Sequence, residues 1–199
     1  HRVIPRRIKI IEDSAHALEI PSLEYVFASC YSFHAAKNIT CGNGGAIAVQ
    51  PEYEKRARLL KRHGVENISG KRVMLELGYK YEMTDFQSAL LIGQLDRVNT
   101  TLEKRRKVFN RYKKAFKEKI DFPQEYGGTH AYHMFVIWVD PKRRDDIRKK
   151  LLAMGIETSI HYPAIHLEPY YQKIGFRKGS FPIAESLGAS TITLPNYPM

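Results

Sequence analysis

Short apolar, β-branched runs separated by turns fill the first fifty residues of the chain. Residues 8–11 form such a run and lead into Glu12 and Asp13, which predicts a buried strand with two carboxylates at its carboxyl end. Residues 25–33 and 44–49 predict two further strands, the last entered through a pair of glycines. Ligands bind at the carboxyl ends of the strands in open α/β sheets, so the two acids are candidates for a binding site.

A basic amphipathic segment follows the third predicted strand. Its apolar residues recur at helical spacing over residues 51–63, which predicts a helix that ends at Gly64. From there to about Gly78 the sequence is polar and is expected to form a loop.

A second helical pattern begins at Thr84. Thr84 followed by Gln87 fits a capping box, in which each residue satisfies a backbone amide of the other. The pattern predicts a long helix that runs, with a break near Gly93 or Asn99, as far as Lys119. Such a helix is expected to bridge two domains.

The last third of the chain predicts a strand, a helix and a second strand. Residues 130–139 are rich in β-branched and aromatic residues and follow a loop at 123–129. Asp140 and Pro141 are expected to open a helix that runs to Met154. Residues 156–160 are expected to return as a strand, which would complete a β-α-β unit.

Composition places the chain among soluble globular proteins. It has 199 residues, 43% of them apolar and 27% charged, so it is expected to fold as one large or two small domains. Residues 134–139 form the longest apolar run, far short of the roughly 20 residues of a membrane span. The basic residues 1–7 lack the apolar core of a secretory signal, and Cys30 and Cys41 are too few for a disulfide scaffold. A cytoplasmic location is therefore expected.

The formal net charge is +11, and much of the excess falls within residues 103–119. Phe109, Tyr112 and Phe116 recur there at helical spacing, which indicates a buried stripe rather than stacking partners for bases. The cations are interpreted as a solvated helix face, and nucleic-acid binding is the least favoured of the functions considered. These cations are Lys104, Arg105, Arg106, Lys107, Arg111, Lys113, Lys114, Lys117 and Lys119.

A few side chains could carry chemistry. Lys37 lies among small and apolar residues, where partial burial favours a nucleophilic amine, although an exposed loop lysine would fit the local pattern better. Asp13 and His16 could point into one cleft or could serve as a cap and a core histidine, and local sequence does not decide. His161 and His166 are five residues apart without a third ligand, so no metal site is expected.

Several motifs taken together resemble the pyridoxal-phosphate-dependent sugar aminotransferases of the DegT/DnrJ/EryC1/StrS family. The similarity covers nearly the whole chain and follows the family's order of motifs. It rests on Asp13-Ser-Ala-His16-Ala, Ser32-Phe-His-Ala-Ala-Lys37-Asn-Ile-Thr, Gly42-Asn-Gly-Gly45, Lys61-Arg-His-Gly64, the run from Gly78-Tyr-Lys-Tyr to Ala89-Leu90, His161-Tyr-Pro-Ala-Ile-His166, Phe181-Pro-Ile-Ala-Glu185 and Leu194-Pro-Asn-Tyr-Pro198.

The resemblance implies roles for four residues around pyridoxal 5'-phosphate. Lys37 matches the lysine that links covalently to the cofactor and then moves the proton. Asp13 matches the carboxylate that keeps the pyridine nitrogen protonated. His16 matches a position beside the ring and its phenolic oxygen, and Ser32 matches a hydroxyl that binds the phosphate. The motif departs from the family at Glu82, where many members carry Asn or Arg.

The resemblance also implies an α/β fold of the type I pyridoxal-phosphate transferase class, in incomplete form. Residues 1–98 correspond to the end of the large cofactor-binding domain, and residues 99–199 to a linking helix and a small α+β domain. His161 and Tyr162 are expected to line the sugar pocket.

The implied reaction moves an amino group from glutamate to a keto sugar nucleotide of the 4-keto-6-deoxy type, in cell-surface polysaccharide or deoxyamino sugar biosynthesis. A homodimer, or association with a companion chain, is expected. The alternative is a catalytically silent homologue or a subunit that depends on its partner, since an unpaired sheet edge or a bare apolar face would promote association.

Overall fold

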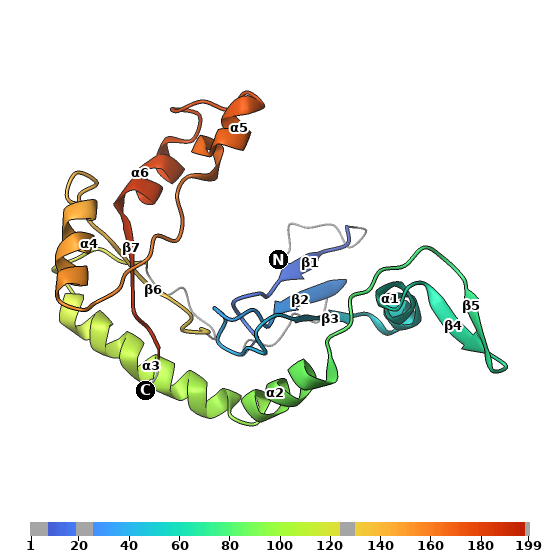
Figure 1. The fold of residues 1–199 in the computed structure, drawn as a ribbon. Coiled ribbons are helices and arrows are strands. Elements are labelled where there is room, and N and C mark those ends of the chain that lie inside the picture. Colours follow the sequence, from blue (N-terminus) through green and yellow to red (C-terminus); the bar gives the residue numbers. More distant parts are fainter. Residues whose placement is uncertain (1–7, 19–25, 124–129, 198–199) are drawn as a thin grey trace. The chain divides into compact units, whose positions relative to one another are not determined.

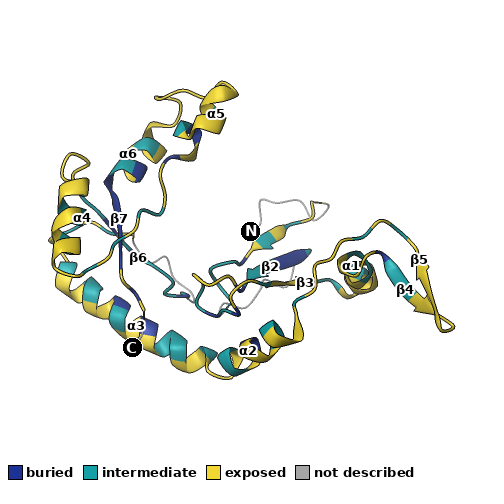
Figure 2. Ribbon diagram, in the orientation of Figure 1, coloured by how far each residue is buried: buried dark blue, intermediate teal, exposed yellow. Residues whose placement is uncertain are grey.

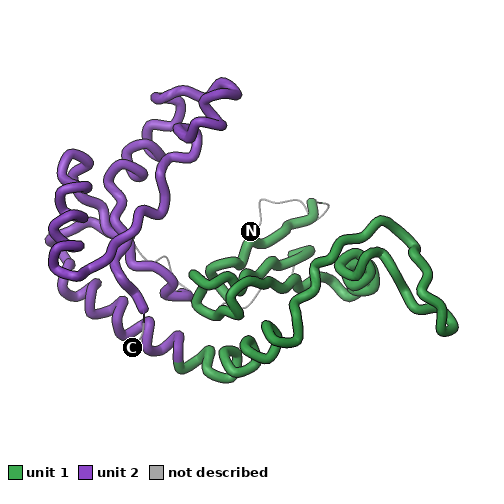
Figure 3. The backbone as a smooth tube through the Cα atoms, in the orientation of Figure 1, with its two compact units in different colours: residues 1–100 green, residues 101–199 purple. Residues whose placement is uncertain are grey.

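The computed structural model describes residues 8–18, 26–123 and 130–197 of the chain. The backbone divides into two compact units, residues 1–100 and 101–199 (Figure 3). Each unit has a hydrophobic cluster of its own, and each is described by itself.

A three-stranded sheet forms the start of the first unit (Figure 1). Its strands are β1 (Ile11–Asp13), β2 (Ala28–Ser32) and β3 (Gly45–Val49), in the order β1-β2-β3. β1 runs parallel to β2 with Asp13 opposite Cys30, and β3 runs antiparallel to β2. The three strands expected from the sequence are therefore present. β2 and β3 lie within their predicted regions, whereas β1 overlaps the predicted run 8–11 only at Ile11 and includes the two acids.

The expectation that the first strand is buried is wrong. Ile11 is 65% exposed and the β3 side chains are exposed or half-exposed, whereas Ala28 and Ser29 of β2 are buried (Figure 2). The two strands with exposed side chains, β1 and β3, are the edges of the sheet, and the buried residues belong to the central strand β2.

A basic helix follows the sheet, as expected. The short 3₁₀ turn η1 (Pro51–Tyr53) leads into α1 (Glu54–Lys61). Gly64 then takes a φ of 68°, a conformation that glycine adopts without strain. A side chain at Gly64 would collide with the carbonyl of Glu76, and one at Gly78 would collide with the backbone of Gly64, so two chain segments pass in direct contact here.

The expected polar loop after this helix is wrong, because the structure has a β-hairpin there. β4 (Val65–Ile68) pairs antiparallel with β5 (Lys71–Met74). Ser69 and Gly70 form the two-residue turn with φ values of 52° and 81°. All four residues of β5 are exposed, so the hairpin lacks the buried face that makes a strand visible in a sequence.

The capping box predicted at Thr84 is confirmed. The Thr84 hydroxyl accepts from the Gln87 amide at 3.3 Å, and the Gln87 side chain accepts from the Thr84 amide at 2.9 Å. The helix that follows, α2 (Asp85–Leu95), is separated from α3 (Val98–Phe116) by the predicted break, and α3 ends slightly earlier than expected. No helix in the described part of the chain has the length and apolar character needed to cross a bilayer.

The second unit is built on an antiparallel pair of strands. β6 (Phe135–Trp138) pairs with β7 (Thr191–Leu194), and α4 (Arg144–Ala153) contacts β7. Phe109 of α3 packs against Phe135 with ring centroids 4.9 Å apart, which confirms the buried aromatic stripe of the helix. Two shorter helices and a 3₁₀ turn complete the unit, namely η2 (Ile165–Leu167), α5 (Pro169–Lys173) and α6 (Pro182–Ser190).

The expected β-α-β unit is wrong. Residues 156–160 form no strand, and only Ser159 makes an isolated bridge, to Thr193. The partner of β6 is β7, from the far end of the chain, because its four residues are all buried and supply the apolar face that the core needs.

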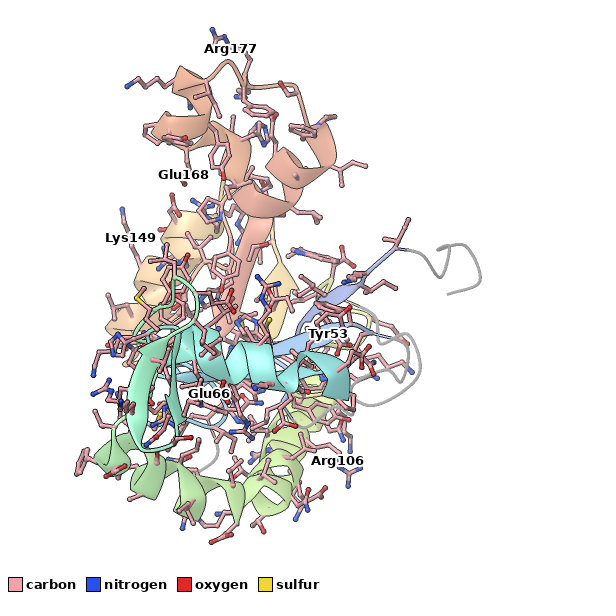
Figure 4. The ribbon with its side chains drawn as sticks, turned by 90° about the vertical axis from the view of Figure 1, so that its right-hand side faces the viewer. Tyr53, Glu66, Arg106, Lys149, Glu168 and Arg177 are labelled. Carbon is pink, nitrogen blue, oxygen red and sulfur yellow. The ribbon has the colours of Figure 1, made fainter. Side chains whose placement is uncertain are left out.

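Arg105 does not lie on the solvated face of α3 where the sequence pattern puts it. The residue is 6% exposed, and its guanidinium donates to the carbonyl oxygens of Asn196 at 2.7 Å and of His133 at 3.3 Å. These carbonyls lie far along the chain, so the helical spacing alone gives no sign of them. Arg106, labelled in Figure 4, is exposed and pairs with Glu103 at 2.7 Å, as a solvated face requires.

Candidate functional site

The parallel pairing of β1 and β2 brings candidate residues to one end of the first sheet. Asp13 ends β1 and Ser32 ends β2, and parallel strands have their carboxyl ends at the same edge. The Ser14 amide donates to the Cys30 carbonyl at 2.9 Å, which continues the pairing past Asp13. His16 is half-buried in the turn that follows. The backbone therefore places Asp13, His16 and Ser32 at this end of the sheet.

Lys37 lies in the loop that joins β2 to β3. The Phe33 amide donates to the Gly44 carbonyl at 2.8 Å and closes the base of this loop. The Lys37 amide donates to the His34 carbonyl at 2.9 Å, which forms a turn, and buried Ile39 anchors the far side. A tied loop with a buried anchor holds the lysine near the end of β2, where its side chain is half-buried.

The donor set at this end of the sheet suits an aldehyde-bearing pyridine with a phosphate. Within the described residues, the Lys37 ammonium has no hydrogen bond or ion pair. One oxygen of Asp13 accepts from the Ala15 amide at 3.0 Å, and the exposed carboxylate keeps its other oxygen for a ligand. The Ser32 hydroxyl accepts from the His34 amide at 3.3 Å and keeps its own proton to donate. An amine, a carboxylate and a hydroxyl donor are the groups that pyridoxal phosphate requires, so the residues fit it.

In the second unit, His161 and Tyr162 lie beside β7. The His161 ring nitrogen Nδ1 lies 3.0 Å from the Thr193 hydroxyl, and the two rings meet edge to face with centroids 4.8 Å apart. Tyr162 is 61% exposed. The histidine is thus held against β7, while the ring of Tyr162 is exposed to solvent.

The sequence gives no sign that His166 pairs with Glu185. His166 is buried, and its Nε2 lies 2.8 Å from Oε1 of Glu185, which also accepts from the Gly179 amide at 2.6 Å. The hydrogen bond with His166 is the main reason that the pKa of Glu185 is lowered. No group of three residues of metal-ligating type is close enough to hold an ion in the described part of the chain.

A cavity between α1 and the β4–β5 hairpin is also not predicted from the sequence pattern, because that pattern predicts a loop in place of the hairpin. Its volume is about 730 Å³. A Ser-Gly pair between two β-prone runs is a two-residue hairpin signal that could have located it. The lining residues are Lys55, Arg58, Leu59, Arg62, His63, Val65, Glu66, Asn67, Arg72, Lys80 and Glu82.

Glu82, the departure from the family motif, belongs to this cavity. Its carboxylate forms an ion pair at 3.0 Å with Arg62, the residue that follows α1. The negative charge that the motif introduces is therefore matched by a neighbouring cation.

Comparison with known proteins identifies relatives that match at least 95% of the chain. The spore coat polysaccharide biosynthesis protein SpsC of Bacillus subtilis is 30% identical over 213 residues, which cover 95% of this chain and 55% of that protein. Spr1654 of Streptococcus pneumoniae, assigned as a sugar aminotransferase and solved in PMP and PLP forms, superposes with a TM-score of 0.87 for the PMP form at 30% identity. DesV of S. venezuelae superposes with a TM-score of 0.85 at 29% identity.

The two structural comparisons cover 96% of this chain but only 52% of Spr1654 and 53% of DesV. The chain thus spans about half the length of the relatives it matches, and over that span it has their α/β aminotransferase fold. The model of the DegT/DnrJ/EryC1/StrS aminotransferase family matches residues 5–199. With a family match over almost every residue, the chain belongs to the DegT/DnrJ/EryC1/StrS aminotransferase family.

Proposed function

We propose that this chain carries the lysine and the carboxylate of a pyridoxal-phosphate-dependent transaminase that acts on a keto sugar nucleotide. The observation that carries the proposal is the parallel pairing of β1 with β2, which puts Asp13 and the loop of Lys37 at the same end of one sheet. Family membership and relatives solved in PLP and PMP forms support the same cofactor here.

Each residue of the donor set has a role that its chemistry allows. Lys37 would hold the cofactor covalently through its amine and afterwards accept and return the proton of the substrate carbon. Asp13 would keep a proton on the ring nitrogen, and Ser32 would donate to the phosphate. His16 would lie beside the ring. Pyridoxal phosphate, when bound, supplies an electron-withdrawing ring that acidifies the substrate carbon next to the amine.

The substrate is proposed to be a nucleotide-linked 4-keto-6-deoxy sugar, with glutamate as the amino donor. The relatives' descriptions as polysaccharide biosynthesis and sugar aminotransferase proteins support a sugar substrate. His161 and Tyr162 are the proposed pocket residues because Tyr162 is exposed beside a histidine fixed by Thr193. The net charge of +11 suits a substrate that carries a diphosphate.

The test traps the covalent link between Lys37 and the cofactor and does not measure catalytic turnover. The purified chain is mixed with pyridoxal phosphate, reduced with borohydride, digested and analysed by mass spectrometry. We expect the cofactor mass on the peptide that contains Lys37, and a visible absorption band before reduction that is absent in Lys37→Ala. Labelling spread over surface lysines, with the same band in the variant, would refute the assignment.

A second candidate is that the chain works only with a partner, either a second copy or a companion chain. It is favoured by the exposed edge strand β1, where Ile11 is 65% exposed. Light scattering of the chain, alone and mixed with a full-length relative, tests it. A monomer in both samples that still takes up cofactor at Lys37 would refute it, and a monomer that takes up none would be a silent homologue.

A further inference from the structure

His34 lies between Ser32 and Lys37 in the loop that joins β2 to β3, and three of its groups form hydrogen bonds within that segment. Its backbone amide donates to the Ser32 hydroxyl at 3.3 Å. Its ring nitrogen Nδ1 accepts from the Ala36 amide at 3.2 Å, and its carbonyl accepts from the Lys37 amide at 2.9 Å. One residue thus links the hydroxyl at the end of β2 to the backbone of the lysine.

The base of the loop is fixed mainly by packing. Phe33, Ile39 and Cys41 are buried in one hydrophobic cluster, and the Cys41 amide donates to the Phe33 carbonyl at 3.1 Å. Residues 34–36, in contrast, are exposed. The turn that they form therefore depends on hydrogen bonds rather than on packing, and the ring of His34 provides one of them.

The contact with Ala36 requires a neutral His34 ring. A backbone amide can only donate, so Nδ1 must hold a lone pair, and the neutral ring carries its proton on Nε2. In the protonated ring both nitrogens are donors, so this hydrogen bond is lost. The turn before Lys37 is therefore complete only while the ring is neutral.

The ring has no charged partner. Within the described residues it accepts from the Ala36 amide and forms no ion pair. Histidine ordinarily changes its charge between about pH 5 and 8, so the contact with Ala36 is expected to weaken as the pH falls through this range. The segments next to the loop include α2, which packs on it through Leu91. The acidic and basic side chains of these segments, none of them bonded to the ring, are Glu12, Asp13, His16, Lys37 and Asp85.

We propose that His34 is a positioning residue for Lys37, which it holds ready for an aldehyde ligand only while its ring is neutral. The inference rests on the proposed function, because it concerns how the same lysine is presented. A turn that loses one contact adopts the ligand-ready conformation for a smaller fraction of the time, and apparent affinity falls by that fraction. An exposed hydrogen bond changes such a population by about three- to tenfold.

Three variants isolate the ring. The side-chain oxygen of asparagine accepts from the amide two residues on and does not titrate, so His34→Asn keeps the contact with Ala36 at every pH. His34→Leu has no acceptor and removes the contact at every pH. His130→Asn is the matched control, because the His130 ring accepts from the Tyr132 amide at 2.9 Å, the same kind of contact in the second unit.

The first measurement needs no cofactor. Nuclear magnetic resonance gives the exchange rate of the Ala36 amide with water, relative to an unstructured peptide at the same pH. At about pH 8 we expect protection of about three- to tenfold in the wild type and in His34→Asn, and none in His34→Leu. At about pH 5 the protection should be lost in the wild type and kept in His34→Asn. The ring proton should be found on Nε2 at the higher pH.

The second measurement is labelling of Lys37 by pyridoxal phosphate and cyanoborohydride, followed by mass spectrometry. Protonation of the lysine affects every variant alike, so the comparison of wild type with His34→Asn isolates the ring. At about pH 8 the two should need the same cofactor concentration for half-maximal labelling, and at about pH 5 the wild type should need about three- to tenfold more. His34→Leu should need that excess at both values, and His130→Asn should match the wild type throughout.

The outcomes separate this inference from the proposed function. Equal exchange of the Ala36 amide in the wild type and in His34→Leu at about pH 8 would overturn the inference. Labelling with the same pH dependence in the wild type and in His34→Asn would also overturn it, as would an altered dependence in His130→Asn. If no protein is labelled at Lys37 at any pH, the proposed function fails, and the amide exchange still decides whether the His34 ring holds the turn.

Discussion

Replacement of Phe135 by alanine is expected to destabilise the second unit severely. Phe135 is 1% exposed, and its ring centroid lies 4.9 Å from those of Phe109 and Tyr112 and 5.6 Å from that of Phe122. Truncation of a buried phenylalanine costs about 3–5 kcal/mol, and each aromatic pair contributes about 0.5–1.5 kcal/mol beyond its buried area. The free energy of unfolding should therefore fall by about 4 kcal/mol, a large share of the roughly 5–15 kcal/mol of a typical domain.

Urea unfolding followed by tryptophan fluorescence measures this loss. Trp138 is the single tryptophan of the chain and belongs to β6 with Phe135, so its signal reports the unit that is perturbed. With a denaturant slope of about 2 kcal/mol per M, the midpoint should drop by about 2 M. Phe86→Ala, at a site 74% exposed, is the control and should change stability by less than about 0.5 kcal/mol. A loss below about 1 kcal/mol for Phe135→Ala would refute the assignment of this residue to the core.

Three further predictions concern local interactions. Thr84→Ala removes the capping box of α2 and should lower the free energy of unfolding by about 1 kcal/mol. Urea unfolding followed by far-ultraviolet circular dichroism measures this loss as a shift in the midpoint, and no shift would mean that the cap is not formed. Gly64→Ala should leave little folded protein, because the added methyl group meets the Glu76 carbonyl, and a normal melting curve would contradict the close contact. Glu185→Gln should destabilise the chain at pH values above the ordinary carboxylate pKa of 4.5, because His166 holds the pKa of Glu185 below that value. The difference in stability between the variant and the wild type should shrink as the pH falls below 4.5, and a difference that grows there would contradict the prediction.

Features that depend on neighbouring residues could be predicted from the sequence. The cap at Thr84 needs only Gln87, three residues on, and the aromatic stripe of α3 needs only helical spacing, so the structure confirms both. The carboxyl ends of the first two strands could also be located, because apolar runs and turns mark them. The motifs along the chain together indicated the family, since the residues of each motif are contiguous in sequence, and the family match over residues 5–199 confirms it.

Features that depend on distant partners could not be predicted. β6 pairs with β7, more than fifty residues away, and not with the nearer residues 156–160. Arg105 is buried because the Asn196 carbonyl, 91 residues along the chain, accepts from it. The β4–β5 hairpin is a different case, because its strands are neighbours in the sequence. β5 is exposed at every position and shows no alternation of apolar and polar residues, so only the Ser69-Gly70 turn signals the hairpin. The cavity beside α1 is not predicted either, because the hairpin forms one of its walls.

The contact between Gly64 and Gly78 separates structure from specificity at the cavity. Backbone atoms hold the segment of Lys80 and Glu82 in place, through two residues without side chains and the hydrogen bonds beside them. The exposed ion pair between Glu82 and Arg62 adds little to this, because pairs of that kind contribute about 0–1 kcal/mol. Substitutions of the charged residues that line the cavity are therefore expected to change its charge while the backbone keeps its path.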